Sequence, residues 1–165
     1  METLQAESLL EQFGLPYFRE LASFGALSDK IVRDMVHKGV CVQLEQGEIL
    51  KPYESPVDGF SIVLQGDIAF YKHCETHDVL TRHFLAGEQI GFDSMIAMIP
   101  NSGTEIAFDD SIVLQVSATQ FFDLHVDFPN DFGLFMINLS RELSREIAML
   151  EEVVGKSTGW KIEGP

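Results

Sequence analysis

Basic residues are scarce in this chain of 165 residues. Lys and Arg together number 11, against 26 Asp and Glu, which gives a formal net charge of −15 at pH 7. Binding to the phosphate backbone of nucleic acids, or to an anionic membrane surface, needs clustered cations. The composition therefore argues against both as partners, while hydrogen-bond donors in a local pocket can still hold one small anion against the global field.

Cysteine and long apolar runs are also scarce. The two cysteines, Cys41 and Cys74, are too few for a disulfide framework and favour a reducing compartment. No apolar run approaches the roughly 20 residues that a membrane-spanning helix needs. The first residues, METLQAESLLEQF, are acidic and lack the basic start of a signal peptide. We therefore expect a cytoplasmic protein with no membrane partner.

An apolar fraction of 45% is enough for one domain with a sizeable core. Residues 1–38 have helical patterns, which Gly14-Leu15-Pro16 interrupts, and Ser28 is placed to cap a second helix. Residues 39–117 contain short apolar runs separated by turn residues, which is typical of a β-sandwich or barrel. The expected strands are Val40–Leu44, Ile49-Leu50, Phe60–Leu64, Ile68–Tyr71, Val79–Leu85, Thr104–Phe108 and Ser111–Val116.

Residues 118–155 return to helical spacing. Ser117 and Gln120 form a capping-box pattern that begins a short helix. Pro129 suits the first turn of a long last helix over residues 129–154, which we expect Gly155 to end. Residues 156–165 are predicted to be a flexible tail.

Between the strands lies a glycine-rich cassette at residues 85–104, with Gly87, Gly91 and Gly103 and an apolar patch over Met95–Ile99. Glycine lets the backbone approach a ligand closely, and a short helix between two turns presents free N–H groups. We interpret this stretch as a ligand-binding cassette within an all-β barrel.

Three stretches resemble the cyclic nucleotide-binding domain, the sensor module of catabolite activator-type regulators, cyclic nucleotide-dependent kinases and gated channels. They are Gln46–Leu50, the strand–glycine–strand run Phe60–Tyr71 and the start of the cassette, Leu85–Gly91. The resemblance covers about residues 20–155. It implies a mainly β fold with flanking helices: a double-stranded β-helix, or jelly-roll barrel, with N-terminal helices and a long C-terminal helix.

The resemblance also implies a ligand site, in which this chain departs from the family. The family's acid after the cassette glycine, which binds the ribose, is replaced by Phe92, and Asp93 follows one place late. The family's phosphate-binding arginine is missing from Asn101–Thr104. The implied ligand-binding residues are Gly91, Phe92, Asp93, Ser94, Ser102, Gly103 and Thr104, with Ser140 and Ser144 of the last helix near the base. A cyclic nucleotide or another small anion is the implied ligand, held less tightly than in the family because Arg gives charge-assisted, bidentate bonds.

The last helix has apolar residues on more than one face, so that one side can pack on the barrel and another on a partner helix. We predict a homodimer through Met136, Leu139, Leu143, Ile147, Leu150 and Val154. Only ten residues follow Gly155, and we expect no DNA-reading module in them.

Two motif fragments have simpler explanations. The Gly155-Lys156-Ser157 run lacks the first glycine of a P-loop. His73, Cys74 and His77, with His83 nearby, have zinc-binding side chains but lie in a polar hairpin tip, and we assign no metal there.

Two functions follow from these patterns. The first is a regulatory sensor domain that acts through an unknown protein partner. The second is a dimerisation or interaction module whose pocket is vestigial or filled by Phe92. An enzyme of cupin type fits least, and we predict no catalytic residues and no resident cofactor.

Overall fold

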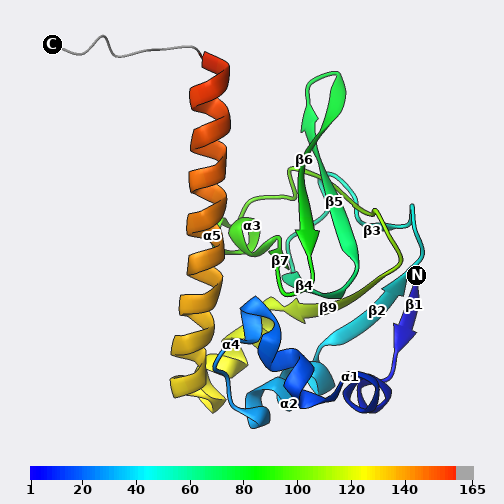
Figure 1. Cartoon of the computed structure of the whole chain (residues 1–165), viewed down its shortest axis with the longest axis vertical. Helices are drawn as coiled ribbons and strands as arrows, with labels where there is room; N and C mark the ends of the chain where they lie inside the picture. The colour runs from blue at the N-terminus through cyan, green and yellow to red at the C-terminus, as the bar shows by residue number, and fades with distance from the viewer. Residues whose placement is uncertain (159–165) are drawn as a thin grey trace, which may run out of the picture.

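The computed structural model describes residues 1–158, which form two antiparallel β-sheets flanked by helices (Figure 1). One sheet has the strand order β1-β2-β9-β4-β7 and the other the order β3-β8-β5-β6. The elements are β1 (Glu2–Leu4), α1 (Ala6–Glu20), η1 (Ala22–Phe24), α2 (Asp29–Lys38), β2 (Val40–Leu44), β3 (Ile49–Lys51), β4 (Gly59–Gln65), β5 (Asp67–Cys74), β6 (His77–Leu85), β7 (Gln89–Ile90), α3 (Phe92–Ala97), β8 (Gly103–Ala107), β9 (Ser111–Ser117), α4 (Ala118–Asp127) and α5 (Pro129–Thr158).

This architecture confirms the predicted mainly β fold with helices at both ends. The two sheets stay separate and do not close into the expected barrel. Three of the four edge strands, β1, β3 and β7, are only two or three residues long.

The N-terminal segment combines the predicted helices with a strand that the sequence did not suggest. Gly14 adopts φ 71° and ψ 153° inside α1, so the helix is broken where Gly14-Leu15-Pro16 predicts an interruption. Within the predicted helical segment 1–38, residues before the first helix form β1, which pairs with β2 at the edge of the first sheet. A three-residue strand leaves no alternation long enough to detect.

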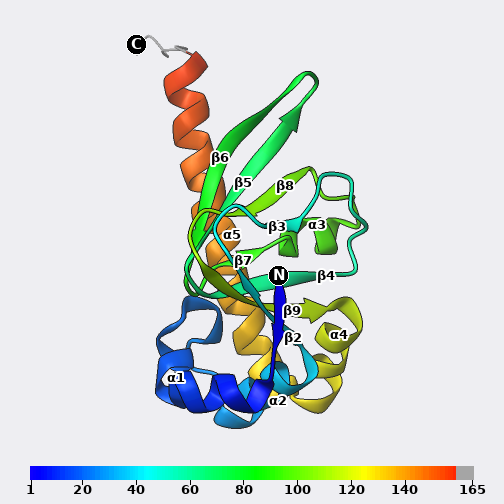
Figure 2. The ribbon, with the colours of Figure 1, turned by 90° about the vertical axis from the view of Figure 1, so that its right-hand side faces the viewer.

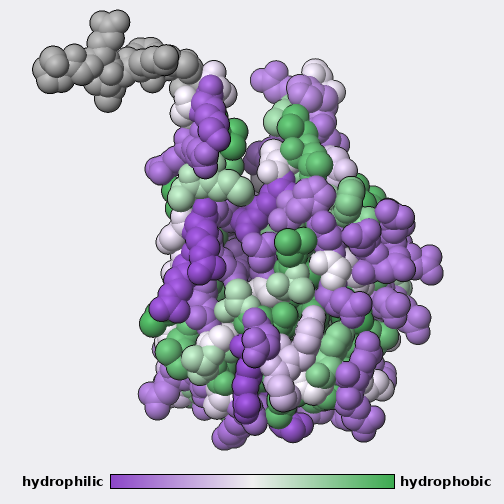
Figure 3. All heavy atoms as spheres, viewed as in Figure 1, coloured by the Kyte–Doolittle hydropathy of each residue, from purple (hydrophilic) through white to green (hydrophobic). Residues whose placement is uncertain are grey.

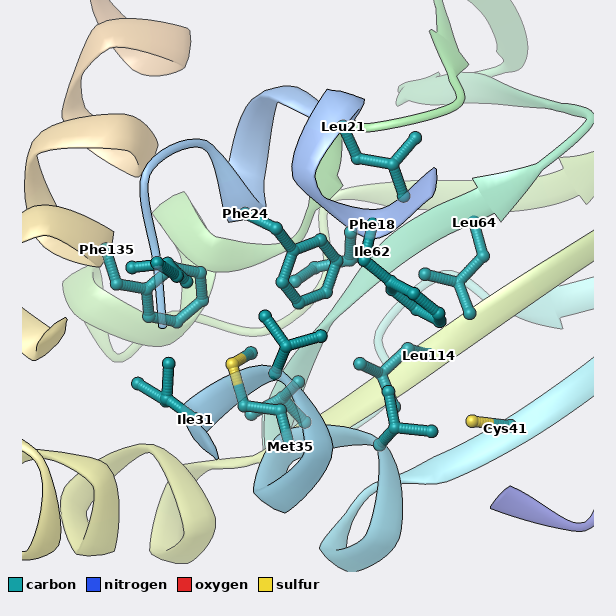
Figure 4. Packing of buried hydrophobic residues seen from close by; sticks show 14 of the residues in the cluster. Phe18, Leu21, Phe24, Ile31, Met35, Cys41, Ile62, Leu64, Leu114 and Phe135 are labelled. Carbon is teal, nitrogen blue, oxygen red and sulfur yellow. The ribbon is translucent and has the colours of Figure 1, made fainter. Parts of the chain in front are cut away.

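The main core lies between the first sheet and the N-terminal helices, α4 and the start of α5 (Figure 4). Phe18, Phe24 and Phe135 are fully buried there and belong to the same core cluster as Ile62 and Leu114 of the sheet. The predicted cap of α4 forms, since Ser117 accepts a hydrogen bond from the backbone N–H of Gln120. The side chain of Gln120 instead donates to the carbonyl of Met35, so it ties α4 to α2.

The last helix, α5, runs along one side of the sheets, and the β5–β6 hairpin extends beside its upper half (Figures 1 and 2). Its first half packs into the core, whereas every residue from Ile147 to Ser157 is exposed. Gly155 does not end this helix, which continues to Thr158. Residues 159–165 of the predicted tail lie outside the described part of the chain. Within residues 1–158, no helix has the length and apolar composition to cross a membrane.

Candidate functional site

A cavity of about 320 Å³ lies between the cassette, the β5–β6 hairpin and α5. The surface is hollowed between the upper half of α5 and this hairpin (Figure 3). Three cassette residues predicted to bind a ligand, Gly91, Asp93 and Ser94, line the cavity on one side, and Ser102 lines it at the cassette end. These four predicted residues therefore lie together at one cavity, and their role in binding a ligand stays a prediction.

Gly91 gives the cassette its shape. It adopts a left-handed conformation, with φ 81°, and serves as the N-cap of α3. A residue with a Cβ would be strained in this conformation, so glycine permits the sharp entrance into the short helix. The turn leaves Ser94 almost fully buried at the cavity wall and Asp93 exposed at its rim.

Three other cassette residues lie away from this cavity. The side chain of Phe92 is 2% exposed and packs at the edge of Phe60 and Phe121 in the core. Its role as a ligand contact, or as a plug of the pocket, is therefore not supported by its position. The Thr104 hydroxyl instead accepts a hydrogen bond from the backbone N–H of Tyr53.

Gly103 has a packing explanation. A Cβ at this position would overlap the carbonyl group of Tyr71 on the neighbouring strand β5. Only glycine lets β8 and β5 approach so closely. The third cassette glycine thus positions strands and does not itself line the cavity.

The last helix presents a different face to the cavity than the sequence suggested. Ser140 and Ser144 are exposed on another side of α5, where the Ser144 hydroxyl donates to the carbonyl of Ser140. Glu146, Met149 and Leu150 line the cavity instead. Helical spacing gives the faces of a helix but not which face meets the sheet, so the two serines lie away from this cavity.

The orientation of α5 about its own axis also changes the predicted dimer surface. Leu139 is fully buried in the core of its own chain, so it is not available to a partner. Met136 and Leu143 are half-buried, and Ile147, Leu150 and Val154 are exposed. Five of the six predicted positions therefore still reach the surface of α5.

Two cations in the cavity wall were missed from the sequence. Lys72 of β5 and Arg82 of β6 both line the cavity. Phe70 is opposite Arg82 in the register, and Lys72 follows Phe70 by two residues, so it shares the same face of the sheet. A β-bulge between Phe70 and Tyr71 shifts the strand pairing here. Because of this shift, the alternation of residues along the two strands does not predict which side chains of β5 and β6 share a face. The signal in the sequence is an arginine inside an otherwise strand-like run.

A buried acid lies where the cavity meets the cassette end. Glu105 of β8 is 1% exposed and accepts a hydrogen bond from the side chain of Asn101 at 3.2 Å. Burial raises the pKa of Glu105 to about 7, and the charge of nearby Lys51 and the bond from Asn101 only partly oppose this. A negative charge at this point repels a phosphate group, and this repulsion grows as pH rises through 7.

A second cavity, of about 370 Å³, lies on the other side of Glu105 and shares Gly91, Ser94 and Asn101 with the first. It is bounded by the β3–β4 loop, with Lys51 and Asp58 3.4 Å apart, and by β4 and β9. Cassette residues therefore line two adjoining cavities, and only the one next to α5 also contacts the helix.

A buried hydrogen-bond network joins the cassette to α5. Glu142 of α5 accepts bonds from the backbone N–H of Gln89 at 3.1 Å and from the Ser23 hydroxyl at 3.2 Å. The side chain of Gln89 in turn accepts the first N–H of α3, that of Phe92. Burial raises the pKa of Glu142 to about 7 against these two favourable bonds. Direct hydrogen bonds thus join the cassette to the middle of α5.

The hairpin tip is narrower than predicted, because the strands continue to Cys74 and from His77, which leaves Glu75-Thr76 as the turn. The imidazole of His73 pairs with Asp78 at 2.8 Å, and His83 pairs with Asp67 at 2.9 Å. In the described part of the chain, no three His, Cys, Asp or Glu side chains are grouped as metal ligands.

Comparison with known proteins gives matches by structure alone. No protein-family model and no curated protein sequence matches the chain. A cyclic nucleotide-binding domain from Methylobacillus flagellatus KT superposes with a TM-score of 0.78 at 21% identity, over 94% of this chain and 88% of that one. The catabolite activator protein of Thermus thermophilus gives a TM-score of 0.68 at 17% identity, over 83% and 63%. A putative cyclic nucleotide-binding protein from Geobacter metallireducens GS-15 gives 0.65 at 14% identity, over 81% and 98%. The chain therefore has the fold of cyclic nucleotide-binding domains, as its sequence predicts.

Proposed function

We propose that this chain is a regulatory sensor domain, which binds a small polar ligand in the cavity beside α5 and acts on a partner protein through that helix. One observation carries the proposal. The cassette residues Gly91 and Ser94 and the helix residues Met149 and Leu150 line the same cavity. A ligand held there contacts both the cassette and the helix, so its binding energy can depend on their relative positions.

Cyclic AMP and cyclic GMP are expected to bind weakly. The cassette supplies no cation at Ser102, and the buried Glu105 lies where a phosphate would approach. Loss of one member of a buried charge pair costs about 2–5 kcal/mol, or roughly thirty- to several-thousand-fold in affinity. From a starting constant on the order of a micromolar, the dissociation constants should be near or above about 0.1 mM.

The output of the sensor is proposed to be the exposed half of α5. The Gln89–Glu142 bond joins this helix to the cassette, and Ile147, Leu150 and Val154 offer an apolar surface to a second helix. We propose a homodimer through this surface together with an unidentified protein partner. The charge of −15 makes DNA and anionic membranes poor partners.

We propose a binding module and not an enzyme. The described titratable groups with strongly raised pKa values near the cavities, Glu105 and Glu142, are engaged in hydrogen bonds within the fold. The free thiols of Cys41 and Cys74 fit a reducing compartment, so we place the protein in the cytoplasm.

The second candidate is an interaction module with a vestigial pocket. Its supporting observation is that two acids, Glu105 and Glu146, line the cavity, where they would repel an anionic ligand. Proteins with the same fold carry names that refer to cyclic nucleotides, which are anions. In this version α5 still pairs with a partner, but no ligand controls it.

Two measurements separate these candidates. A thermal-shift screen of nucleotides, cyclic dinucleotides and small acids should yield a ligand that raises the melting temperature if the sensor proposal is right. Calorimetry with cyclic AMP and cyclic GMP should give constants near or above about 0.1 mM. A low-micromolar constant would overturn the weak-binding part of the proposal, and a screen without any stabilising compound would favour the second candidate.

A further inference from the structure

Arg82 lies between two carboxylates at the contact of the hairpin and the last helix. Its Nη1 atom is 2.5 Å from Oε2 of Glu146 on α5, and its Nη2 atom donates to Oε1 of Glu88 at 3.4 Å. We propose that Glu146 acts as a built-in competitor: a ligand bearing a carboxylate or phosphate replaces it on Arg82 and frees the outer half of α5. This inference rests on the proposed function of the cavity as a ligand site.

Arg82 is held in a state that suits anion recognition. Its side chain is 11% exposed, and its guanidinium lies over the ring of Phe84, 4.2 Å from the centroid. Stacking fixes the plane of the guanidinium, and a planar fork binds carboxylate and phosphate with two parallel bonds. The cation is therefore already ordered and largely desolvated before a ligand arrives.

The existing pair with Glu146 is close in distance but poor as a hydrogen bond. Nη1 of Arg82 is buried and forms no hydrogen bond of acceptable geometry within residues 1–158, although the Glu146 oxygen lies 2.5 Å away. An unmet buried donor on a charged group is costly. A free oxyanion can align with this donor, whereas Glu146 is constrained by the helix backbone. A ligand anion can thus form a better-aligned hydrogen bond to Arg82 than the residue that it replaces.

Lys72 supplies a second positive group on the same wall. It is half-buried, and the described residues contain no carboxylate within ion-pair distance of it. Asp93 of the cassette also lines the cavity and can accept hydrogen bonds, whereas Glu105 lies on the same sheet wall as the cations, beside Phe70 of β5. The favoured ligand therefore has its anionic group toward the hairpin and N–H or O–H donors toward the cassette.

Displacement of Glu146 has a structural consequence because of its place in α5. The residues before it include the buried Glu142, while all residues from Ile147 to Ser157 are exposed. The ion pair with Arg82 thus holds α5 to the hairpin at the border between its packed and its exposed half. Because the exposed half has so few buried contacts, little free energy is needed to separate it from the hairpin or to unfold it once this ion pair is lost.

The test compares Glu146→Gln with wild type, with Arg82→Gln/Glu146→Gln and with a matched control, Glu151→Gln. Glu151 is exposed on the same helix, and its replacement makes the same change in charge away from the cavity. Inorganic phosphate and succinate are the two probes, titrated separately and followed by nuclear magnetic resonance shifts. Glu146→Gln should bind one of them at least about tenfold more tightly than wild type and Glu151→Gln, and the double variant should lose this gain. The probe that gains identifies the anion as phosphate or carboxylate.

A second measurement needs no ligand. Amide hydrogen exchange over residues 147–157 should be at least about fivefold faster in Glu146→Gln than in wild type, with Glu151→Gln unchanged. The proposal is overturned if exchange is unaltered, if neither probe gains affinity, or if the gain persists without Arg82. A screening ligand that binds Arg82→Gln as tightly as wild type would overturn it as well, yet would leave the sensor function intact. The sensor function itself fails if no screened compound stabilises wild type, whatever the variants show.

Discussion

Position 102 is the residue at which the cassette differs most simply from a phosphate-binding site. Ser102 is half-buried in the cavity wall, and its hydroxyl carries no charge. The substitution Ser102→Arg should place a guanidinium in the cavity, where charge-assisted bonds to phosphate are strong. We expect the affinity for cyclic AMP to rise about ten- to a hundredfold, measured by calorimetry at fixed salt.

The control for this prediction is Thr76→Arg, which adds the same charge at the exposed hairpin turn. An equal gain in both variants would mean that the reduced net charge, and not a local contact, is responsible. Restoring an acid at position 92 is not a useful companion change. The side chain of Phe92 is packed among core aromatic rings, so a glutamate there would be buried without a partner.

At the scale of elements, the contact between α5 and the cassette depends on one buried acid. Glu142 is 4% exposed, and burial raises its pKa to about 7 from an ordinary value of 4.5, in spite of bonds from Gln89 and Ser23 and the charge of Arg82. The folded state therefore holds a proton that the unfolded state releases between these two pH values. Stability from this group is fully present below about pH 4.5 and is lost as pH rises through 7, by about 3 kcal/mol in total.

Glu142→Gln should remove this part of the pH dependence. Urea denaturation at pH 5 and pH 8 should show a loss of stability with rising pH that is smaller by about 2.5 kcal/mol in the variant than in wild type, since part of the total is already lost at pH 5. Glu105 is expected to contribute a separate loss in the same direction, since its pKa is also raised to about 7. Glu151→Gln, at an exposed site on the same helix, is the control. A variant with the full wild-type pH dependence would show that Glu142 ionises freely in the folded protein.

The elements themselves differ in how far the sequence predicts them. The start of α5 at Pro129 and the longer strands follow from local sequence and sustained periodicity, whereas the end of α5 lies beyond the predicted stop at Gly155. Strands β1 and β7 have three and two residues and contain no period to detect. The face of α5 that meets the cavity was also not predictable, because the helix is apolar on several sides. Packing against the hairpin, and not the helix sequence, selects Glu146 and Met149 for that face.

The candidate site shows the same limit at the scale of the whole molecule. The cassette wall, with Gly91 and Ser94, was predictable because those residues are contiguous in sequence. The cations Lys72 and Arg82 and the acid Glu146 come from a hairpin and a helix far apart in the chain. Which of these side chains meet depends on strand register and helix rotation, and neither is encoded in a short motif.

At the scale of the whole molecule, the apolar residues of the last helix predict that two copies form a homodimer. Met136, Leu143 and Leu150 recur every seven residues, and Ile147 and Val154 follow two of them by four, which is the spacing of a coiled-coil seam. Leu139 is buried in its own chain and cannot take part in this seam. Ile147, Leu150 and Val154 remain available to a partner, since they are between 47% and 57% exposed. Burial of such side chains between two copies removes apolar surface from water. We therefore expect a dimer of parallel or antiparallel α5 helices at micromolar concentration.

The prediction is tested by analytical ultracentrifugation of Ile147→Arg and of Val126→Arg, a control at an equally exposed apolar residue on α4. Ile147→Arg should weaken dimerisation at least about a hundredfold, because each dimer would have to desolvate two arginines, whereas Val126→Arg should behave as wild type. Each copy carries a charge of −15, so the two repel over a distance that shortens from about 30 Å at 0.01 M salt to about 8 Å at 0.15 M. Wild type should accordingly dimerise more tightly as salt rises. A monomer at high micromolar concentration across this range of salt would refute the homodimer, because repulsion between copies could no longer account for the failure to pair.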